Sequence, residues 1–405
     1  MPQKSSICDR NDVAITVFYD SCHGIESIGM TEVQTRASSA LFGGKGHTSV
    51  SRGLGEFQGG RPVLISATGQ AVLALPVEGL DAQRLAEFMT LCRPVVPRLV
   101  ITERRALALG LDASTPMALP LSAADDANTI LSLVTDATND RAPAAKPASW
   151  AAAAAIQLVK LSQGLPAVLA ADMSALPAAC EEIIVRVEAD AVARFANDAI
   201  RSLMIASEAS VPLSSGTTTR FVVFRDAMGG SPVAIIVGKP DLTDAVPVRL
   251  HSACLTGDVF GSRRCDCGDQ LRLALARLEK LGGGVILYLA QEGRGLGLAN
   301  KMRTYQLQDD GLDTFDANTT LGFDDDERDY GVAARMLRML NCTRIALLTN
   351  NPAKLAGLTK AGIEIVSRMP LEAPINADNH RYMTAKAARS GHRLEHLTAS
   401  LAEQS

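Results

Sequence analysis

Apolar residues in the first half of the chain recur with two different spacings. A short apolar run predicts a strand over residues 61–66, and a period near that of a helix predicts a helix over residues 82–91. The segment PAAKPASWAAAAA at residues 143–155 combines prolines with an alanine run, which predicts a loop that enters a helix at about Trp150. Helical character is expected to continue over residues 177–200.

The second half predicts alternating strands and helices after an initial group of β-rich runs. Strands are expected at residues 220–224, 233–237, 246–250, 285–289, 344–348 and 363–367, and helices at residues 270–281, 298–308, 327–340 and 353–361. The strands at 285–289 and 344–348 are continuous apolar runs, of the kind that is buried in a sheet. The expected fold class is therefore α+β.

A change in composition divides the chain. Residues 211–219, with the sequence VPLSSGTTT, are rich in turn-forming residues and suit a domain boundary, and the joint is placed near residue 205. The expected organisation is an unassigned segment at 1–50, one domain at 51–204, a second domain at 205–395 and a tail at 396–405.

Composition narrows the class of protein. A chain of 405 residues that is 47% hydrophobic is long enough for two or three domains with their own cores. A net charge of -4 argues against a general nucleic-acid or membrane-surface binder, so an anionic ligand must meet a local cluster of basic residues. No secretory or membrane-spanning segment is found, and the expected location is the cytoplasm. The eight cysteines are too sparse for a disulfide scaffold.

Three cysteines form the sharpest motif. Cys254, Cys265 and Cys267 have the spacing C-x10-C-x-C directly after a predicted strand. Zinc prefers thiolates in tetrahedral geometry, and three protein ligands leave a fourth position for a water whose pKa the metal lowers to about 7. The alternatives are three reduced core cysteines, or a structural zinc completed by a residue such as His251. The nucleobase-deaminase signature is absent from the sequence.

Three further segments carry charged or glycine-rich chemistry. QEGRGLG at residues 291–297 follows a strand and could hold a phosphate through Arg294 and a helix N-terminus, although a tight turn would explain its glycines equally well. GFDDDERD at residues 322–329 is expected to open the helix that begins near Glu327, either as a solvated cap or as a site for proton transfer and phosphate contact. LTNNPAK at residues 348–354 lies at the C-terminal edge of a strand, where α/β folds commonly bind ligands.

Basic residues near these segments could supply the positive charge that the whole chain lacks. They are Arg249, Arg263, Arg264, Arg294, Lys301, Arg303, Arg328 and Lys354.

Taken in order, RLHSACLTGD, RCDCG, QEGRGLGLANKMRTYQLQDDG, LGFDDDERD and LLTNNPAK resemble the successive motifs of the GTP cyclohydrolase II family. The resemblance implies a mixed α/β catalytic domain in which Cys254, Cys265 and Cys267 hold one catalytic zinc ion per subunit. It implies a GTP site formed by Arg249, Leu250, His251, Ser252, Ala253, Gln270, Glu292, Gly293, Arg294, Thr314, Thr349 and Lys354. It also implies that Asp326 is the proton acceptor, that Arg328 is the nucleophile at the α-phosphorus, and that Tyr305 lies near the ring being opened.

The same resemblance predicts the reaction and the partners. GTP would be hydrolysed to 2,5-diamino-6-(5-phosphoribosylamino)pyrimidin-4(3H)-one, formate and pyrophosphate in riboflavin biosynthesis, with Mg²⁺ on the triphosphate. A homodimer is expected, with no nucleic-acid or membrane partner. Ala253 departs from the family pattern, which has glutamate at this position. The alternatives are therefore a homologue that acts on another nucleotide and a non-catalytic GTP-binding regulator.

The first domain resembles, in framework segments only, 3,4-dihydroxy-2-butanone 4-phosphate synthase, a family often fused to GTP cyclohydrolase II. That family has an acidic segment after the first strand and a histidine-containing segment later. This chain has SATGQAVL at residues 66–73 and ASWAAA at residues 148–153 in those places. Because the carboxylates and the histidine are missing, the domain is expected to be catalytically inactive and to serve structure, dimerisation or regulation.

Overall fold

The computed structural model describes residues 44–138, 144–173, 175–226, 229–379, 384 and 389. Most of the unassigned segment at 1–50 and the whole of the tail at 396–405 lie outside these residues. The described residues from Lys45 onward belong to one compact unit, which contains two seven-stranded sheets. Among the described residues, no helix combines the length and the apolar content that a membrane crossing requires.

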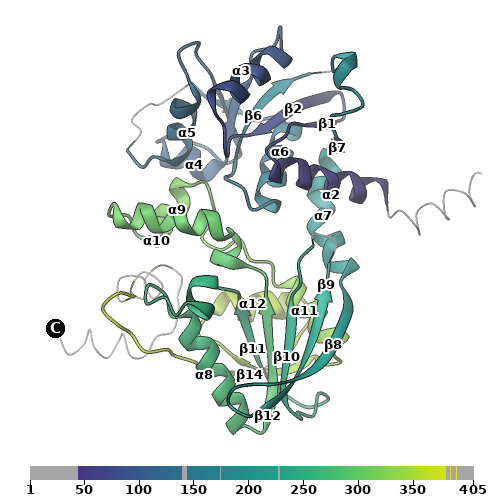
Figure 1. Ribbon diagram of the computed structural model, residues 1–405, viewed down its shortest axis with the longest axis vertical. Coiled ribbons are helices and arrows are strands. Elements are labelled where there is room, and N and C mark those ends of the chain that lie inside the picture. The colour runs from purple at the N-terminus through teal and green to yellow at the C-terminus, as the bar shows by residue number, and fades with distance from the viewer. Residues whose placement is uncertain are drawn as a thin grey trace, which may run out of the picture. The chain divides into compact units, whose positions relative to one another are not determined.

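The first sheet is almost entirely antiparallel, with the order β5-β4-β3-β6-β2-β1-β7 (Figure 1). Its strands are β1 (Val63–Ala67), β2 (Gln70–Pro76), β3 (Arg98–Ile101), β4 (Met117–Pro120), β5 (Lys146–Pro147), β6 (Ala167–Asp172) and β7 (Arg186–Glu188). The pair β1–β7 is parallel, and every other neighbouring pair in this sheet is antiparallel.

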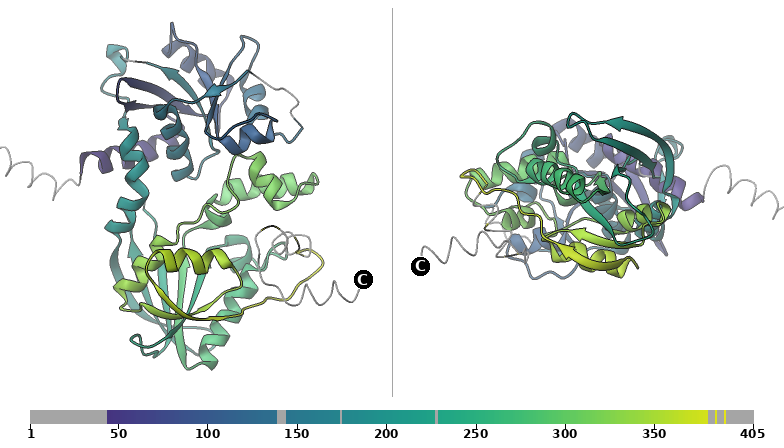
Figure 2. Two further views of the ribbon diagram at one scale, coloured as in Figure 1. Left: turned by 180° about the vertical axis from the view of Figure 1, so that it is seen from behind. Right: turned by 90° about the horizontal axis from the view of Figure 1, so that it is seen from below.

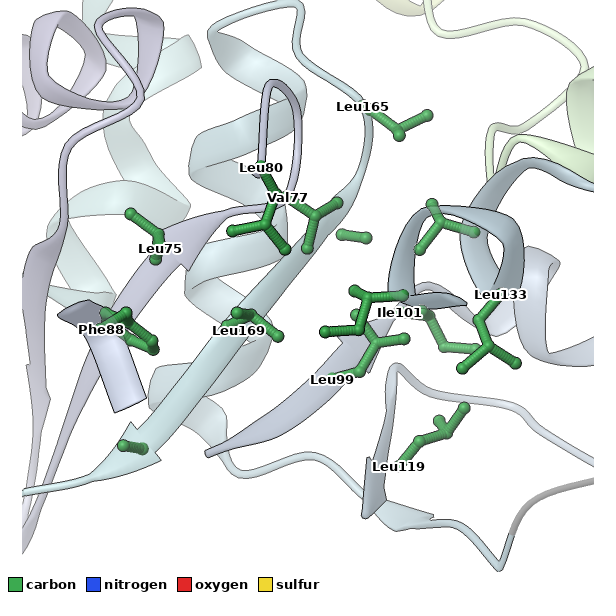
Figure 3. Close-up of a cluster of buried hydrophobic side chains, with 14 of the residues drawn as sticks. Leu75, Val77, Leu80, Phe88, Leu99, Ile101, Leu119, Leu133, Leu165 and Leu169 are labelled. Carbon is green, nitrogen blue, oxygen red and sulfur yellow. The ribbon is translucent and has the colours of Figure 1, made fainter. Parts of the chain in front are cut away.

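Six helices cover the two faces of this sheet. They are α2 (Lys45–Gln58), α3 (Ala82–Leu91), α4 (Glu103–Ala108), α5 (Ala127–Thr135), α6 (Trp150–Leu161) and α7 (Ala189–Ser202). Because strand side chains alternate between faces, Ile65 packs with α2, α6 and α7, whereas its neighbour Leu64 packs in the opposite cluster with α3, α4 and α5. Figure 3 shows part of this second cluster, in which Leu99 and Ile101 point toward Leu133.

The second sheet has a parallel half and an antiparallel half, in the order β14-β13-β11-β12-β10-β9-β8. Its strands are β8 (Met204–Pro212), β9 (Thr218–Arg225), β10 (Val233–Gly238), β11 (Val246–Ser252), β12 (Gly283–Leu289), β13 (Arg344–Leu348) and β14 (Glu364–Met369). The strands from β14 to β12 are parallel, and those from β12 to β8 are antiparallel.

Five helices accompany the second sheet: α8 (Cys267–Lys280), α9 (Leu298–Asp309), α10 (Thr314–Thr320), α11 (Gly331–Met339) and α12 (Pro352–Lys360). Helix α8 packs on one face through Ala274 and Leu278, and α11 and α12 pack on the other through residues such as Leu337 and Leu358 (Figures 1 and 2). Both faces of the parallel half are therefore covered, as its continuous apolar strands predicted.

The α+β fold class is confirmed, and most predicted elements lie within a few residues of their expected positions. Three expectations were wrong. Residues 177–200 are not continuously helical, because the β-branched run at 183–187 leads into strand β7. Residues 213–217 form the turn between β8 and β9 inside the second sheet, so the VPLSSGTTT segment does not separate domains.

The third wrong expectation concerns the acidic run. Helix α11 begins at Gly331, not near Glu327, and the acidic run lies in the preceding loop. This acidic loop (residues 322–330) is held by its own side chains, since the backbone amide of Arg328 donates to Asp326 and that of Gly331 donates to Asp329. These carboxylates therefore cap local turns rather than the first turn of a longer helix.

Candidate active site

The candidate site lies where three parallel strands end. Residues 252–254 follow or end β11, residues 291–297 follow β12, and residues 349–354 follow β13. Because β11, β12 and β13 are parallel, these segments meet at the same edge of the sheet, the edge at which α/β proteins usually bind ligands. The first segment ends in Cys254, one of three cysteines whose sulfurs lie close together.

The three cysteine sulfurs have the geometry of a metal site. The sulfurs of Cys254, Cys265 and Cys267 lie within 4.8 Å of one another, and those of Cys254 and Cys265 are 3.7 Å apart. A tetrahedral site with zinc–sulfur bonds of about 2.3 Å requires sulfur atoms about 3.8 Å apart. Cys254 and Cys265 are buried, as sulfur ligands of a metal usually are. The chemistry and spacing of the donors therefore fit a thiolate-bound metal.

A short π-type turn, η2 (Leu255–Val259), carries the backbone past the sulfurs. Its glycine, Gly257, donates its backbone N–H to the Cys254 sulfur at 3.3 Å. A Cβ at Gly257 would lie 2.9 Å from the Cys265 sulfur and 3.0 Å from the Cys254 sulfur, too close for a real side chain. Only glycine therefore fits this turn.

A fourth protein ligand is not found among the described residues. The group that could hold a metal contains the three sulfurs alone. The imidazole of His251, which had been considered as a structural ligand, instead lies 3.0 Å from the carboxylate of Asp258 through Nε2. Within this part of the chain, a metal held by these three sulfurs would have a fourth position open for a water or a substrate atom.

Asp258 belongs to the cysteine loop (residues 254–267) and bonds it to the neighbouring strands β11 and β12. Its carboxylate accepts hydrogen bonds from the Tyr288 hydroxyl at 2.9 Å and from the backbone N–H of Cys254 at 3.0 Å. It also contacts His251, whose side chain is 2% exposed. Burial lowers the pKa of His251, although the contact with Asp258 opposes that shift. This buried cluster fixes the position of the first cysteine.

Lys301 of α9 reaches the same cysteine from the other side. Its Nζ lies 3.0 Å from the Cys254 sulfur, 2.8 Å from Glu292 and 2.9 Å from the Thr256 hydroxyl. Burial opposes a positive charge here, but the contacts with Cys254 and Glu292 outweigh it and raise the pKa of Lys301. Hydrogen bonds from Cys265, Cys267 and Lys301 lower the pKa of the Cys254 thiol, which favours its thiolate.

The glycine-rich segment is a tight turn that places Glu292 and Arg294. Gly293 and Arg294 have φ angles of 61° and 62°, in the left-handed region that a residue other than glycine rarely adopts. Glu292 accepts the backbone N–H of Leu255 at 2.7 Å, so the turn is tied to the cysteine loop. The strained backbone at Arg294 is the kind that persists where the surroundings hold a side chain in place for function.

In the acidic loop, Asp326 and Arg328 form a two-pronged ion pair. Nε and Nη2 of Arg328 donate to the two carboxylate oxygens of Asp326 at 2.7 and 2.6 Å, and the Tyr330 hydroxyl donates to the same carboxylate at 3.2 Å. Burial opposes the charge of Asp326, but the contacts with Arg328 outweigh it and lower the pKa. The carboxylate is therefore ionised and paired at neutral pH.

A cavity joins these features. It is lined by Arg249, His251, Ser252, Ala253, Cys254, Arg264, Cys265, Asp266, Cys267, Gln270, Glu292, Gly293, Arg294, Leu296, Lys301, Thr304, Tyr305, Gln308, Thr314, Asn318, Arg328, Thr349, Asn350, Asn351, Lys354, Leu371, Glu372 and Ala373. Among the predicted site residues, Asp326 and Leu250 do not line it. Asp326 lies behind Arg328, and the Leu250 carbonyl accepts a hydrogen bond from Lys354 at 2.7 Å.

Positive charge is concentrated on the cavity wall. Arg249 is buried, with a pKa lowered to about 10 by that burial, and its Nε has no hydrogen-bond partner among the described residues. Lys354 is also buried, and Arg264 lies over the Tyr305 ring at 4.5 Å. Two members of the expected basic group lie elsewhere, because Arg263 pairs with Asp378 and Arg303 pairs with Glu78.

Sequence reasoning missed the role of several residues. Lys301 was included only as part of a positive cluster, although its separation of four residues from Tyr305 places both on one face of α9. Asp258 and Asn318 were not singled out. Asn318 gives no signal in the sequence, because α10 was not predicted and only the fold brings it to the cavity.

Comparisons with known proteins find relatives over most of the chain. The chain matches the family model described as GTP cyclohydrolase II over residues 204–370. It is 41% identical over 368 residues to a GTP cyclohydrolase-2 of Xylella fastidiosa, covering 87% of this chain and 89% of that one. It is 42% identical over 361 residues to a GTP cyclohydrolase-2 of Azospirillum brasilense, covering 85% and 93%. A riboflavin biosynthesis protein RibBA of Parabacteroides distasonis is 49% identical over 179 residues, 44% of each chain.

Proposed function

This chain belongs to the GTP cyclohydrolase II family, and from that premise we propose that it hydrolyses GTP to 2,5-diamino-6-(5-phosphoribosylamino)pyrimidin-4(3H)-one, formate and pyrophosphate in riboflavin biosynthesis. One observation carries the proposal: three cysteine sulfurs with the spacing of a tetrahedral metal site lie on the wall of a cavity lined by arginine and lysine.

Cys254, Cys265 and Cys267 hold one zinc ion in this proposal, because three thiolates are donors that zinc prefers. Bound zinc supplies hydroxide at neutral pH, which the opening of the imidazole ring of guanine requires. Lys301 contributes a positive charge beside Cys254, which offsets part of the negative charge of three thiolates. Tyr305 lines the same cavity as the cysteines, and in this proposal it contacts the ring that is opened.

The cationic side of the cavity binds the triphosphate. Arg249, Arg294 and Lys354 provide positive charge, and Mg²⁺ accompanies the triphosphate because it binds mainly through phosphate oxygens with few protein ligands. The remaining GTP contacts come from Leu250, His251, Ser252, Ala253, Gln270, Glu292, Gly293, Thr314 and Thr349. Gln270 accepts a hydrogen bond from Arg249 and so fixes the direction of that guanidinium.

Asp326 and Arg328 release pyrophosphate in this proposal. Arg328 attacks the α-phosphorus, pyrophosphate leaves, and Asp326 accepts the guanidinium proton; water then cleaves the N–P bond, which frees the nucleotide product and restores Arg328. The ion pair supports these roles, because Asp326 already accepts hydrogen bonds from both Nε and Nη2 of Arg328. The lowered pKa of Asp326 keeps its carboxylate ionised and able to accept hydrogen bonds from Arg328 before the attack.

The test is to incubate purified, zinc-analysed protein with GTP and Mg²⁺ and to follow formate and pyrophosphate. We expect both products from the wild type, and neither formate nor bound zinc from Cys265→Ser. Bound zinc and bound GTP without any product would contradict the proposal and favour a GTP-binding regulator.

Ala253 supports a second candidate, a homologue with another nucleotide substrate. This residue lines the cavity where the family pattern has a glutamate, so a carboxylate is missing beside the substrate. Release of formate from a different purine nucleotide, with a higher kcat/KM than from GTP, would favour this candidate. Stoichiometric formate and pyrophosphate from GTP would exclude it.

The protein is further proposed to work in the cytoplasm as a homodimer. Strand β8 supports dimerisation. It is a nine-residue strand at the edge of the second sheet, and its exposed side chains include those of Met204 and Ile205. Exposed edge strands are usually covered in folded proteins. Sedimentation of the purified protein at twice the monomer mass is the expected result.

A further inference from the structure

The N-terminal region (residues 45–202) contacts segments that carry candidate site residues, although its own sheet carries none of the predicted site residues. Leu296, Leu321 and Phe323 belong to the second half of the chain, yet they are buried in the hydrophobic cluster of the first sheet. Their side chains are at most 2% exposed. Leu296 lies in the turn that carries Arg294, and Phe323 lies three residues before Asp326.

Side chains of helix α4 and of its N-cap residue donate hydrogen bonds to backbone carbonyls at the start of the acidic loop. The Thr102 hydroxyl, which also caps this helix, donates to the Gly322 carbonyl at 2.8 Å. Nη1 of the buried Arg105 donates to the Thr320 carbonyl at 2.9 Å. A Cβ at Gly322 would lie 2.7 Å from the Thr102 hydroxyl, and Gly322 has a φ of 84°. The close approach therefore requires glycine at this position.

Two basic side chains of the N-terminal region pair with carboxylates next to Asp326. Arg104 Nε lies 2.6 Å from Asp324, and Lys160 Nζ lies 2.5 Å from Glu327 and 3.9 Å from Asp324. Glu327 also accepts the backbone N–H of Asp324, and its own N–H donates to the Arg294 carbonyl. The pairs therefore connect the N-terminal region to both segments that carry Arg294 and Arg328.

Helix α9, which carries Lys301 and Tyr305, is held in the same way. The Asn300 amide donates to the carbonyls of Gln163 and Gly164 at 3.0 and 3.2 Å, and Arg303 Nη2 lies 2.6 Å from Glu78. Asn300 and Arg303 flank Lys301 in the sequence. Three segments of the site are thus attached to the N-terminal region.

We propose that the N-terminal region is a positioning part of the cyclohydrolase site, which fixes the acidic loop so that Asp326 and Arg328 meet the α-phosphate. This inference rests on the proposed function. The apolar contacts of Leu321 and Phe323 hold the start of the loop, and Arg104 and Lys160 pair with carboxylates in its middle. Neither Arg104 nor Lys160 lines the cavity, so both act through the positions of Asp326 and Arg328.

The experiment uses the full chain with Arg104→Met and Lys160→Met combined, which leaves the buried contacts in place. We expect kcat for GTP to fall about tenfold or more, because a small misplacement of reacting groups is costly. KM for GTP and zinc content should change less than about twofold, because the cysteines and the residues expected to bind GTP lie outside the acidic loop. Lys160→Arg should keep most of the activity, since it preserves the ion pair. Arg186→Met is the matched control, because Arg186 pairs with Glu181 on the exposed surface of the same region.

Amide hydrogen exchange over residues 321–330 provides a readout that does not depend on turnover. It should be faster in the double variant than in the wild type and unchanged in Arg186→Met. Thr102→Val tests the same loop through Gly322, with Thr102→Ser as the rescue. Unchanged kcat and unchanged exchange in both Thr102→Val and the double variant would overturn the inference. If the wild type forms no formate, the proposed function fails, and exchange alone decides whether the region positions the loop.

Discussion

At the scale of single residues, Lys301 places a positive charge next to a sulfur of the candidate metal site. Its Nζ contacts the Cys254 sulfur and Glu292, and its side chain is almost fully buried. Groups that bond to metal ligands tune the affinity of a site by roughly 10- to 100-fold. The lysine therefore links the cysteine loop, the glycine-rich turn and helix α9.

We expect Lys301→Met to weaken zinc binding by about 10- to 100-fold, because the Cys254 thiolate loses its cationic partner and Glu292 is left without one. Competition with a zinc chelator measures the dissociation constant. Lys280→Met, at the exposed end of α8, is the control and should bind zinc as the wild type does. Equal affinities for all three proteins would show that the contact has no role in metal binding.

His251 gives a prediction on pH. Burial lowers the pKa of its imidazole below the ordinary value of about 6.5, so the folded protein favours the neutral ring. The unfolded chain then binds a proton at a higher pH than the folded chain does. The contribution of His251 to the free energy of unfolding is therefore fully present above about pH 6.5. It is lost as the pH falls through the pKa that His251 has in the folded protein.

The free energy of unfolding of the wild type, minus that of His251→Gln, should therefore decrease as the pH is lowered from about 7.5 to about 5.5. Urea unfolding of both proteins after removal of metal by a chelator measures this difference at each pH. Metal is removed because thiolate ligands also take up protons in acid. A difference that stays constant over this range would show that burial of the neutral ring does not contribute.

At the scale of elements, the turn η2 (Leu255–Val259) brings distant cysteines together. Cys254 ends the extended segment that follows β11, and Cys267 begins α8. The turn between them is closed at Gly257, whose backbone contacts the sulfur of Cys254. Gly268 packs on the same turn, since a Cβ there would lie 2.2 Å from the Gly257 carbonyl oxygen.

Gly257→Ala should reduce zinc affinity by at least about tenfold, because the added methyl group pushes Cys254 and Cys265 away from tetrahedral spacing. Metal content after dialysis against a weak chelator is the measurement. Gly55→Ala in α2 is the matched control, because no atom lies within 4 Å of its added Cβ. That variant should keep its zinc and gain at most about 1 kcal/mol of stability.

At the scale of the whole molecule, the first sheet carries a cavity where the resemblance to butanone phosphate synthase would place a second active site. The cavity is lined by both replaced segments, including Gly69, Gln70 and Ser149. Asp172 is the sole carboxylate on the wall of this cavity among the described residues. The same wall carries two basic residues, Arg98 and Lys146. A magnesium-dependent reaction of a sugar phosphate requires several oxygen ligands and an acid or base.

We therefore expect the purified chain to form no 3,4-dihydroxy-2-butanone 4-phosphate from a sugar phosphate with Mg²⁺, even when the same preparation releases formate from GTP. The measurement is product analysis of both reactions on one sample. Formation of the butanone phosphate at a rate comparable to formate release would show that another set of residues supplies the missing chemistry.

The sequence by itself determined the family and the α+β class, and it predicted the three thiols that the structure brings together as a group able to hold a metal. These features depend on local spacing: the apolar runs specify buried strands, and C-x10-C-x-C lies on one loop between a strand and a helix. The assignments of the GTP-binding and catalytic residues stay predictions, although 13 of the 15 line one cavity and the other two, Asp326 and Leu250, contact its walls.

Only the tertiary structure decided which groups Lys301, Asp258 and the acidic loop contact. The acidic run resembles a helix start in sequence, but its carboxylates pair with Arg328 nearby and with Arg104 and Lys160, more than 150 residues away. Hydrophobic periodicity reports the face that a residue buries, and it carries no information about a partner in another sheet. The physical reason is that these contacts form between side chains that the chain brings together only after both sheets are built.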